Sequence, residues 1–113
     1  MMSLSEIKNQ MPGENVIEDV SNLFKILGDT TRVKILFVLE QGPLCVGDIA
    51  SCTDMTKYAV SHHLRLLRQA KLVKTRRSGK TIFYALDDEH VSQIFDCALA
   101  HVQEGSKRQL PTT

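Results

Sequence analysis

The apolar positions of the chain change their spacing near Leu72. Before it, and again after about residue 88, apolar side chains recur every three to four residues, the period of an α-helix with one buried face. Gly28 and the pair Gly42-Pro43 are placed to end the first two helices, and Thr56 is placed to cap the fourth. The pattern predicts five helices, at about 15–27, 30–40, 46–52, 57–70 and 88–104.

The third and fourth predicted helices have the layout of a helix-turn-helix. The short segment Asp54-Met55-Thr56 forms the turn between them. In the second of the two helices, Val60, Leu64 and Leu67 are spaced to face inward, while polar and basic side chains face outward. In this motif the second helix enters the major groove of DNA.

The segment that begins at Leu72 predicts a β-hairpin. The runs 72–76 and 81–86 are rich in β-branched and aromatic residues, and the basic tip Arg77-Ser78-Gly79-Lys80 supplies a glycine for the turn. A basic hairpin directly after a helix-turn-helix is a wing that contacts phosphates or the minor groove. The alternative is a structural hairpin with a solvated tip. We therefore expect a winged helix-turn-helix, mainly α with a β-hairpin wing (α+β).

Length and hydropathy limit the domain organisation. A chain of 113 residues is one small domain, for which oligomerisation would help to complete the core. We expect a mobile arm at 1–14, which is polar and contains Pro12-Gly13, a domain at 15–104 and a flexible tail at 105–113. Neither a run of eighteen apolar residues nor the layout of a signal peptide is present, so a cytoplasmic protein without a membrane partner is expected.

The net charge of +1 conceals a strong segregation of charge. Eight basic residues and no acidic residue lie between Thr56 and Lys80, whereas the rest of the chain carries 6 basic and 13 acidic residues. A charge run is usually a solvated face, but this pattern is also typical of a surface that binds a polyanion such as double-stranded DNA. His63 is predicted to face inward as a structural histidine. The candidate DNA contacts are Thr56, Lys57, Tyr58, Ser61, His62, Arg65, Arg68, Arg76, Arg77 and Lys80.

The three cysteines are an odd number and form no CxxC pair, so reduced thiols are expected. Cys45 and Cys52 are predicted to be small buried apolar residues. Cys97 lies in the last helix, where it could meet its counterpart in a second copy, although core packing is favoured.

The last helix carries candidate metal ligands at both ends. His90 and His101 are eleven residues apart, roughly 16 Å along a helix, so one chain cannot bring them to a shared ion. If a second copy runs antiparallel, the register that pairs His90 with the partner copy's residue 101 also brings Asp88 opposite residue 104, a glutamate. Two nitrogens and two carboxylate oxygens suit tetrahedral zinc, in two identical sites per dimer. The alternative is that Asp88, His90, His101 and Glu104 are solvated surface residues.

These motifs resemble the ArsR/SmtB family of bacterial metal-responsive repressors. The resemblance covers nearly the whole chain from about residue 17 and rests on the runs 44–50, 59–68 and 86–90 and on the pattern D-x-H, H-x-x-E. It implies a homodimer, joined through its N- and C-terminal helices, that binds an imperfect inverted-repeat operator when metal-free. Metal at the interface of the last helices then releases the DNA. The zinc-sensing members have ligands at the positions of Asp88, His90, His101 and Glu104.

One departure from the family pattern affects which metal we expect the chain to bind. Cadmium- and lead-sensing members carry Cys-Val-Cys-Asp where this chain has Cys45-Val46-Gly47-Asp48, and they have further cysteines in the N-terminal arm, where this chain has none. We therefore expect zinc or a similar divalent metal rather than a thiophilic one. Three alternatives remain: a thiophilic metal, a switch by thiol oxidation at Cys45, Cys52 or Cys97, and a zinc enzyme. The enzyme is disfavoured because four protein ligands leave no open position on the metal and no HExxH pattern occurs.

Overall fold

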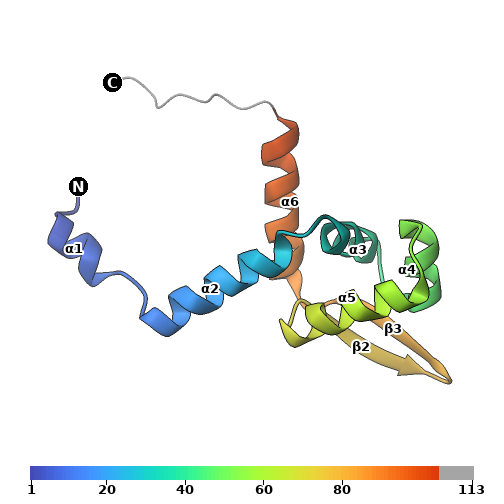
Figure 1. Cartoon of the computed structure of the whole chain (residues 1–113). Coiled ribbons are helices and arrows are strands. Elements are labelled where there is room, and N and C mark those ends of the chain that lie inside the picture. Colours follow the sequence, from blue (N-terminus) through green and yellow to red (C-terminus); the bar gives the residue numbers. More distant parts are fainter. Residues whose placement is uncertain (105–113) are drawn as a thin grey trace.

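The computed structural model describes residues 1–104 and is a winged helix-turn-helix. The helix-turn-helix and the hairpin form one end of the molecule, α6 stands away from that body, and α2 and α1 extend to the side (Figure 1). The fold class is therefore as the sequence predicts. The helices are α1 (Leu4–Asn9), α2 (Glu14–Leu27), α3 (Thr30–Glu40), α4 (Val46–Thr53), α5 (Lys57–Gln69) and α6 (Glu89–Gln103), and the strands are β1 (Leu44–Cys45), β2 (Val73–Ser78) and β3 (Thr81–Leu86).

The hydrophobic core lies where α3, α4 and α5 meet the start of β2. On α5, Val60, Leu64 and Leu67 are at most 1% exposed, which confirms the inward face predicted from the 4-3 spacing. Two residues of α3 that share the apolar pattern, Val33 and Phe37, are instead 38% and 48% exposed. The core therefore holds α5 firmly in place and leaves part of α3 uncovered. The buried cluster consists of Ile35, Leu36, Leu39, Ile49, Ala50, Val60, Leu64, Leu67, Leu72, Val73 and Val91.

Side-chain caps fix where α3 and α5 begin. The Asp29 carboxylate accepts a hydrogen bond from the backbone N–H of Arg32 at 3.0 Å, and the Thr56 hydroxyl accepts one from Ala59 N–H at 3.1 Å. These bonds satisfy backbone donors that the first turn of a helix leaves without partners. Asp54, with φ of 55°, makes the left-handed end of α4 that turns the chain toward α5.

The Asp29 cap gives a stability prediction. The hydrogen bond from Arg32 N–H and the Arg32 charge hold the pKa of Asp29 below its usual value, against desolvation, which raises it. A carboxyl whose pKa is lower in the folded state stabilises above its unfolded pKa and loses that contribution as pH falls through the folded value. We expect Asp29→Ala to lower the free energy of unfolding by about 0.5–2 kcal/mol at pH 7. Urea titrations at pH 7 and at a series of acidic pH values measure this, and the difference should shrink as the pH falls.

Asp29→Asn is the matched control because asparagine also caps helices but does not ionise. It should keep most of the stability at pH 7. An alanine variant as stable as the parent at pH 7 would contradict the role of this cap.

The sheet contains one strand more than the sequence predicts. β3 pairs antiparallel with β2 on one side and with the two-residue strand β1 on the other, in the order β1-β3-β2. The hairpin tip is also narrower than the predicted 77–80. Ser78 pairs with Thr81, so Arg77 and Ser78 belong to β2 and only Gly79 and Lys80 form the turn. Gly79 takes a φ of +63°, which a residue without a Cβ adopts at little cost.

The N-terminal segment contains a helix that the apolar pattern does not predict. This helix, α1, lies within residues 1–14, and the mobility expected of this arm stays a prediction. Ser3 and Glu6 form a capping box, in which the Ser3 hydroxyl accepts from Glu6 N–H at 3.1 Å and the Glu6 carboxylate accepts from Ser3 N–H at 3.2 Å. These bonds also lower the pKa of Glu6. Every residue of α1 is exposed, so a local cap rather than core packing accounts for this helix.

Two further points concern membrane-spanning helices and the C-terminal tail. In the part that the structure describes, no helix is long and apolar enough to span a membrane. The predicted flexible tail, 105–113, lies outside the described residues.

Candidate functional sites

All ten candidate DNA contacts lie on the surface of the helix-turn-helix and the hairpin. Thr56 caps α5, six of the candidates are exposed residues of α5, and each of the remaining ones is exposed as well. The five on α5 beyond Lys57 lie outside the stripe of Val60, Leu64 and Leu67, which faces the core. Helix α5 therefore presents one continuous polar and basic face.

The hairpin adds positive charge beside that face. Arg76 and Arg77 lie on β2, across from Phe83 and Ile82, and Lys80 is in the two-residue turn. In Figure 1 the hairpin runs next to α5 and projects past it. Of the described acidic residues, none belongs to the segment 56–80, so the cations of the two elements form a surface suited to phosphates.

The two neighbouring histidines of α5 differ in environment, as predicted. His62 is exposed, whereas His63 is half-buried, and its buried Nδ1 atom has no hydrogen-bond partner among the described residues. Their ring centroids are 5.5 Å apart. His62 is therefore available to DNA, and His63 belongs to the interior side of the helix.

The first pair of candidate metal ligands lies at the start of α6. Asp88 is the N-cap, and its Oδ1 atom accepts hydrogen bonds from the backbone N–H groups of His90 at 2.9 Å and Val91 at 3.3 Å. Its Oδ2 atom is 3.4 Å from Nδ1 of His90. Desolvation raises the pKa of Asp88, but the hydrogen bonds from the His90 ring and the two backbone N–H groups outweigh it and leave the pKa lowered. The cap thus holds an ionised carboxylate beside an imidazole.

The second pair lies at the other end of the same helix. His101 is in the last turn of α6 and Glu104 is its C-cap, and both are exposed. Within residues 1–104 no group of three or more His, Cys, Asp or Glu side chains is close enough together to hold an ion. One chain therefore offers two separate ligand pairs, and the pairing of these across two chains stays a prediction.

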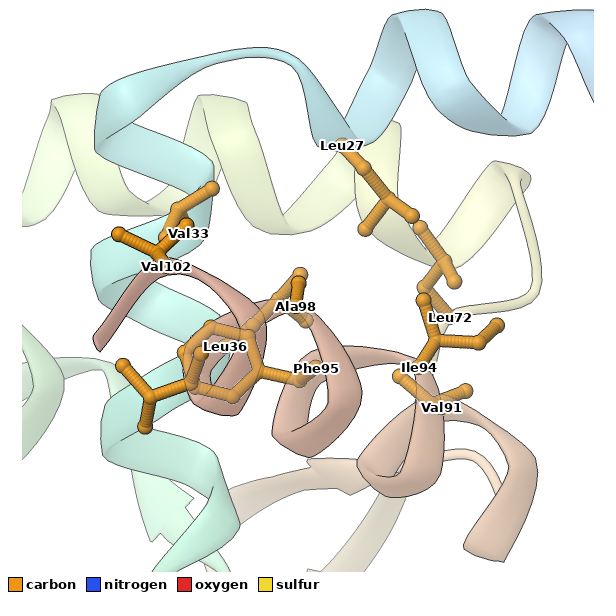
Figure 2. A pocket seen from close by; sticks show the side chains of 10 residues that line it. Leu27, Val33, Leu36, Leu72, Val91, Ile94, Phe95, Ala98 and Val102 are labelled. Carbon is orange, nitrogen blue, oxygen red and sulfur yellow. The ribbon is translucent and has the colours of Figure 1, made fainter. Parts of the chain in front are cut away.

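An apolar groove runs between α6, the end of α2 and the start of α3 (Figure 2). Its volume is about 250 Å³. Leu27 and Leu72 lie at one end beside Ile94 and Val91, and Val33 and Val102 lie at the other (Figure 2). Nearby apolar residues of α2 and α6 are also exposed, Phe24 by 63% and Val102 by 75%. A surface of this composition is suited to contact with another protein surface rather than with water. The lining is completed by Leu36, Phe95, Ala98 and Leu99.

Helix α6 is also joined to α3 by a hydrogen bond that the sequence does not reveal. The Ser92 hydroxyl donates to Oε2 of Glu40, the last residue of α3, at 2.8 Å. A hydrogen bond with Asp96, one turn further along α6, raises the pKa of Glu40. The rings of Phe37 and Phe95 lie next to this link, with centroids 6.0 Å apart. Ser92 is two residues from His90, so the link joins the ligand-bearing end of α6 to α3.

The cysteines differ from their predicted environments. Cys45 is half-buried at the N-cap of α4, which is close to the expected small buried residue. Cys52 is exposed, contrary to prediction, and only Ile49 and Ala50 of α4 are buried. Cys97 is exposed on α6, so in a single chain it is not a core residue.

The family model described as "Bacterial regulatory protein, arsR family" matches residues 29–75. The chain is 47% identical over 87 residues to the cadmium resistance transcriptional regulatory protein CadC homolog of Staphylococcus aureus, covering 76% of this chain and 72% of that one. It is 37% identical over 87 residues to the SmtB homolog of Synechocystis, a transcriptional repressor, covering 77% and 66% of the two chains. Among solved structures, a homodimeric winged helix-turn-helix DNA-binding domain of Mycobacterium bovis superposes with a TM-score of 0.77 at 27% identity, covering 91% of this chain and all of that one.

The fold, the basic face of α5 and these likenesses define a class of protein: a DNA-binding transcriptional regulator, not an enzyme. Within that class, the chain belongs to the arsR family of bacterial regulatory proteins. The family resemblance expected from the sequence is thereby confirmed.

Proposed function

We propose that this protein is a homodimeric repressor that binds its operator when metal-free and releases it when zinc binds between the two α6 helices. The observation that carries the proposal is the arrangement of α6. Its two exposed ligand pairs, Asp88 with His90 and His101 with Glu104, lie at opposite ends of a helix that lines an apolar groove, which no segment within residues 1–104 fills. A second copy that covers the apolar face can place each end of α6 beside the opposite end of the other copy's α6.

The second copy is the occupant that best fits the apolar face. Leu27 of α2 lines the groove, and α2 also carries the exposed apolar residues Val16, Val20 and Phe24, so much of the uncovered apolar surface belongs to the N- and C-terminal helices. The similar domain from Mycobacterium bovis is a homodimer. Burying such a face removes apolar surface from water at roughly 25 cal/mol per Å², which favours association.

The donor set fits zinc. An antiparallel pair of α6 helices supplies each site with the nitrogens of His90 and of the partner's His101 and with carboxylate oxygens from Asp88 and the partner's Glu104. Bound zinc would act as a cross-link of fixed geometry between the chains. The carboxylate of Asp88, whose pKa is lowered, is held beside His90, and metal ligands must be deprotonated to coordinate, so zinc binding releases protons and weakens as the pH falls.

Release follows from a difference in affinity between two dimer geometries. Zinc stabilises the arrangement of α6 that satisfies four ligands. If that arrangement moves the two α5 helices away from the ~34 Å spacing of successive major grooves, DNA affinity falls. A coupling free energy of about 1–3 kcal/mol corresponds to a 5- to 150-fold loss of affinity.

The hydrogen bond from Ser92 to Glu40 is the described contact best placed to transmit that change. Replacing Ser92 by alanine should keep zinc binding and metal-free DNA binding, but should reduce the zinc-induced loss of DNA affinity about 2- to 12-fold, the worth of one hydrogen bond of ~0.5–1.5 kcal/mol. Anisotropy titrations with and without zinc measure both affinities. Ser92→Thr is the control that keeps a hydroxyl, and equal responses in the alanine variant and the parent would remove this contact from the route.

The choice of metal needs a direct test because the Staphylococcus aureus relative is named for cadmium resistance. A thiolate-rich site at the start of α4 would need more than the single thiol of Cys45, and position 47 is a glycine. We therefore propose zinc, with other divalent metals as weaker effectors. The choice between the two metals can be tested by letting zinc and cadmium compete for the protein and measuring the release of DNA. Release by cadmium alone, abolished by Cys45→Ser and not by His101→Ala, would contradict the assignment.

A switch by thiol oxidation is the second candidate, and the exposure of Cys52 and Cys97 favours it. Cys97 lies on α6 between the two ligand pairs, close to where an antiparallel partner would cross. DNA binding measured after peroxide treatment tests this reading. Release by peroxide in chelator, lost in Cys97→Ser, would favour the thiol switch over the metal switch.

A further inference from the structure

The DNA-facing surface carries two exposed apolar side chains, Tyr58 and Ile82. Tyr58 is 86% exposed and Ile82 is 42% exposed. The other large apolar residues that are exposed among residues 1–104 lie before α4 or on α6, near the N-terminus or on the faces of α2, α3 and α6. Dimerisation through α2 and α6 can cover many of those, but it leaves Tyr58 uncovered. The exposure of this ring therefore needs a different explanation.

Tyr58 lies at the end of α5 that reaches base pairs. It is the second residue of the helix after the cap Thr56. The N-terminal residues of a recognition helix contact base edges, while the flanking residues contact phosphates. Ser61 and His62, three and four residues further on, lie on the same face as Tyr58 and are exposed. The ring is thus bordered by side chains that can hydrogen-bond to base edges.

The ring itself offers something different from its neighbours. No hydrogen bond to the Tyr58 hydroxyl and no aromatic pair with its ring occurs within the described part of the chain. In the major groove, A, G and C are read through hydrogen-bond donors and acceptors, whereas thymine adds a C5-methyl group that apolar side chains contact. Lys57, Ser61 and His62 can bond to the polar groups, and the Tyr58 ring is the apolar surface among them.

We infer that Tyr58 is a specificity-determining residue that reads the C5-methyl group of a thymine, one in each half-site of the operator. This inference rests on the proposed binding of a dimer to an inverted repeat. According to this inference, the aromatic ring of Tyr58, and not its hydroxyl group, contacts the methyl group. The competing role, a hydroxyl that donates to a phosphate, would strengthen binding to every sequence alike and would not depend on a methyl group.

The test uses a duplex selected by the full-length protein from a random pool, in chelator and at fixed salt. Each thymine of the selected site is replaced by deoxyuridine, which lacks only the methyl group, and affinity is measured by anisotropy. We expect one thymine per half-site to be sensitive, with about a fourfold loss of affinity for each, the equivalent of one buried methyl group at ~0.8 kcal/mol. Tyr58→Phe should keep that loss, and Tyr58→Ala should remove it.

Ile82→Ala is the matched control because it removes the other exposed apolar side chain of this surface. It should leave the penalty for deoxyuridine at the sensitive thymine unchanged. All three variants alter exposed side chains, and their circular dichroism and thermal unfolding should match those of the parent.

Three results would overturn the inference: a parent protein indifferent to deoxyuridine at every thymine, an alanine variant with the parent's penalty, or a phenylalanine variant that loses it. Failure of the proposed function is distinguishable from these. A protein that selects no sequence from the pool would contradict operator binding as well, whereas selective binding without methyl dependence would contradict only the role of Tyr58.

Discussion

Replacing His101 by alanine is expected to abolish the response to zinc and to leave DNA binding in chelator unchanged. His101 is exposed in the last turn of α6, away from the core and from α5, so the substitution should not disturb the fold or the DNA-binding face. It removes one of the two nitrogen ligands from each proposed site. In the parent, zinc should lower DNA affinity 5- to 150-fold, which corresponds to a coupling free energy of ~1–3 kcal/mol. In the variant, DNA affinity should be the same with and without zinc, since the coupling depends on zinc linking the two chains.

Gln103→Ala is the matched control for that variant. Gln103 is an exposed residue of the same helical turn and is not a proposed ligand. Anisotropy titrations of both variants, with chelator and with two zinc ions per dimer, make the comparison. A full zinc response in His101→Ala would remove His101 from the site, and loss of the response in Gln103→Ala would show that the end of α6 matters for a reason other than coordination.

The double variant Arg65→Ala/Arg77→Ala should lose most of the DNA affinity while keeping zinc binding. Arg65 is exposed on α5 and Arg77 on β2, so the pair samples both elements of the basic surface. If both side chains contact phosphates, the slope of log affinity against log salt should fall by about two, because each such contact releases about 0.9 counterion. If one of them contacts a guanine edge instead, about 1–3 kcal/mol of sequence discrimination should be lost with it.

Lys25→Ala provides the control for general loss of positive charge. Lys25 is exposed on α2, outside the basic surface of α5 and the hairpin. Its removal should change DNA affinity and the salt slope very little. A double arginine variant that binds as tightly as Lys25→Ala would contradict the assigned surface.

Much of the fold could be predicted because its signals are local. The 4-3 spacing of Val60, Leu64 and Leu67 describes a single helix face, and the structure buries that face. The bounds of α2, α3 and α5 lie within a residue of the prediction, since glycines and capping side chains end and begin these helices. The hairpin follows from its β-branched and aromatic residues and from Gly79.

The elements that were missed have weak or overlooked signals. β1 has two residues, Leu44 and Cys45, which is too short for any periodicity, and it exists because β3 offers an edge for pairing. α1 could have been found, because Ser3 and Glu6 have the spacing of a capping box. A prediction that α1 packs against the hydrophobic core would have been wrong, since every residue of this helix is exposed.

The features of the candidate sites also divide into those that the sequence could predict and those that it could not. The DNA-facing residues belong to one helix and one hairpin, so their exposure could be inferred from spacing and charge. The exposure of Cys52, and the link from Ser92 to Glu40, depend on how α3, α4 and α6 pack, which no local pattern specifies. The proposed metal site depends on two chains, so residue spacing can only suggest a register for α6 against a second copy.

The most direct test of the metal-released repressor is fluorescence anisotropy of a labelled DNA fragment from upstream of the protein's own gene. The fragment is titrated with protein in chelator and again with two zinc ions per dimer, at one fixed salt concentration, because phosphate contacts make affinity depend on salt. We expect tight binding in chelator that weakens by about tenfold or more with zinc, ~1.4 kcal/mol or more of coupling. Tight binding of equal strength with and without zinc would contradict the account and leave only the DNA-binding surface standing.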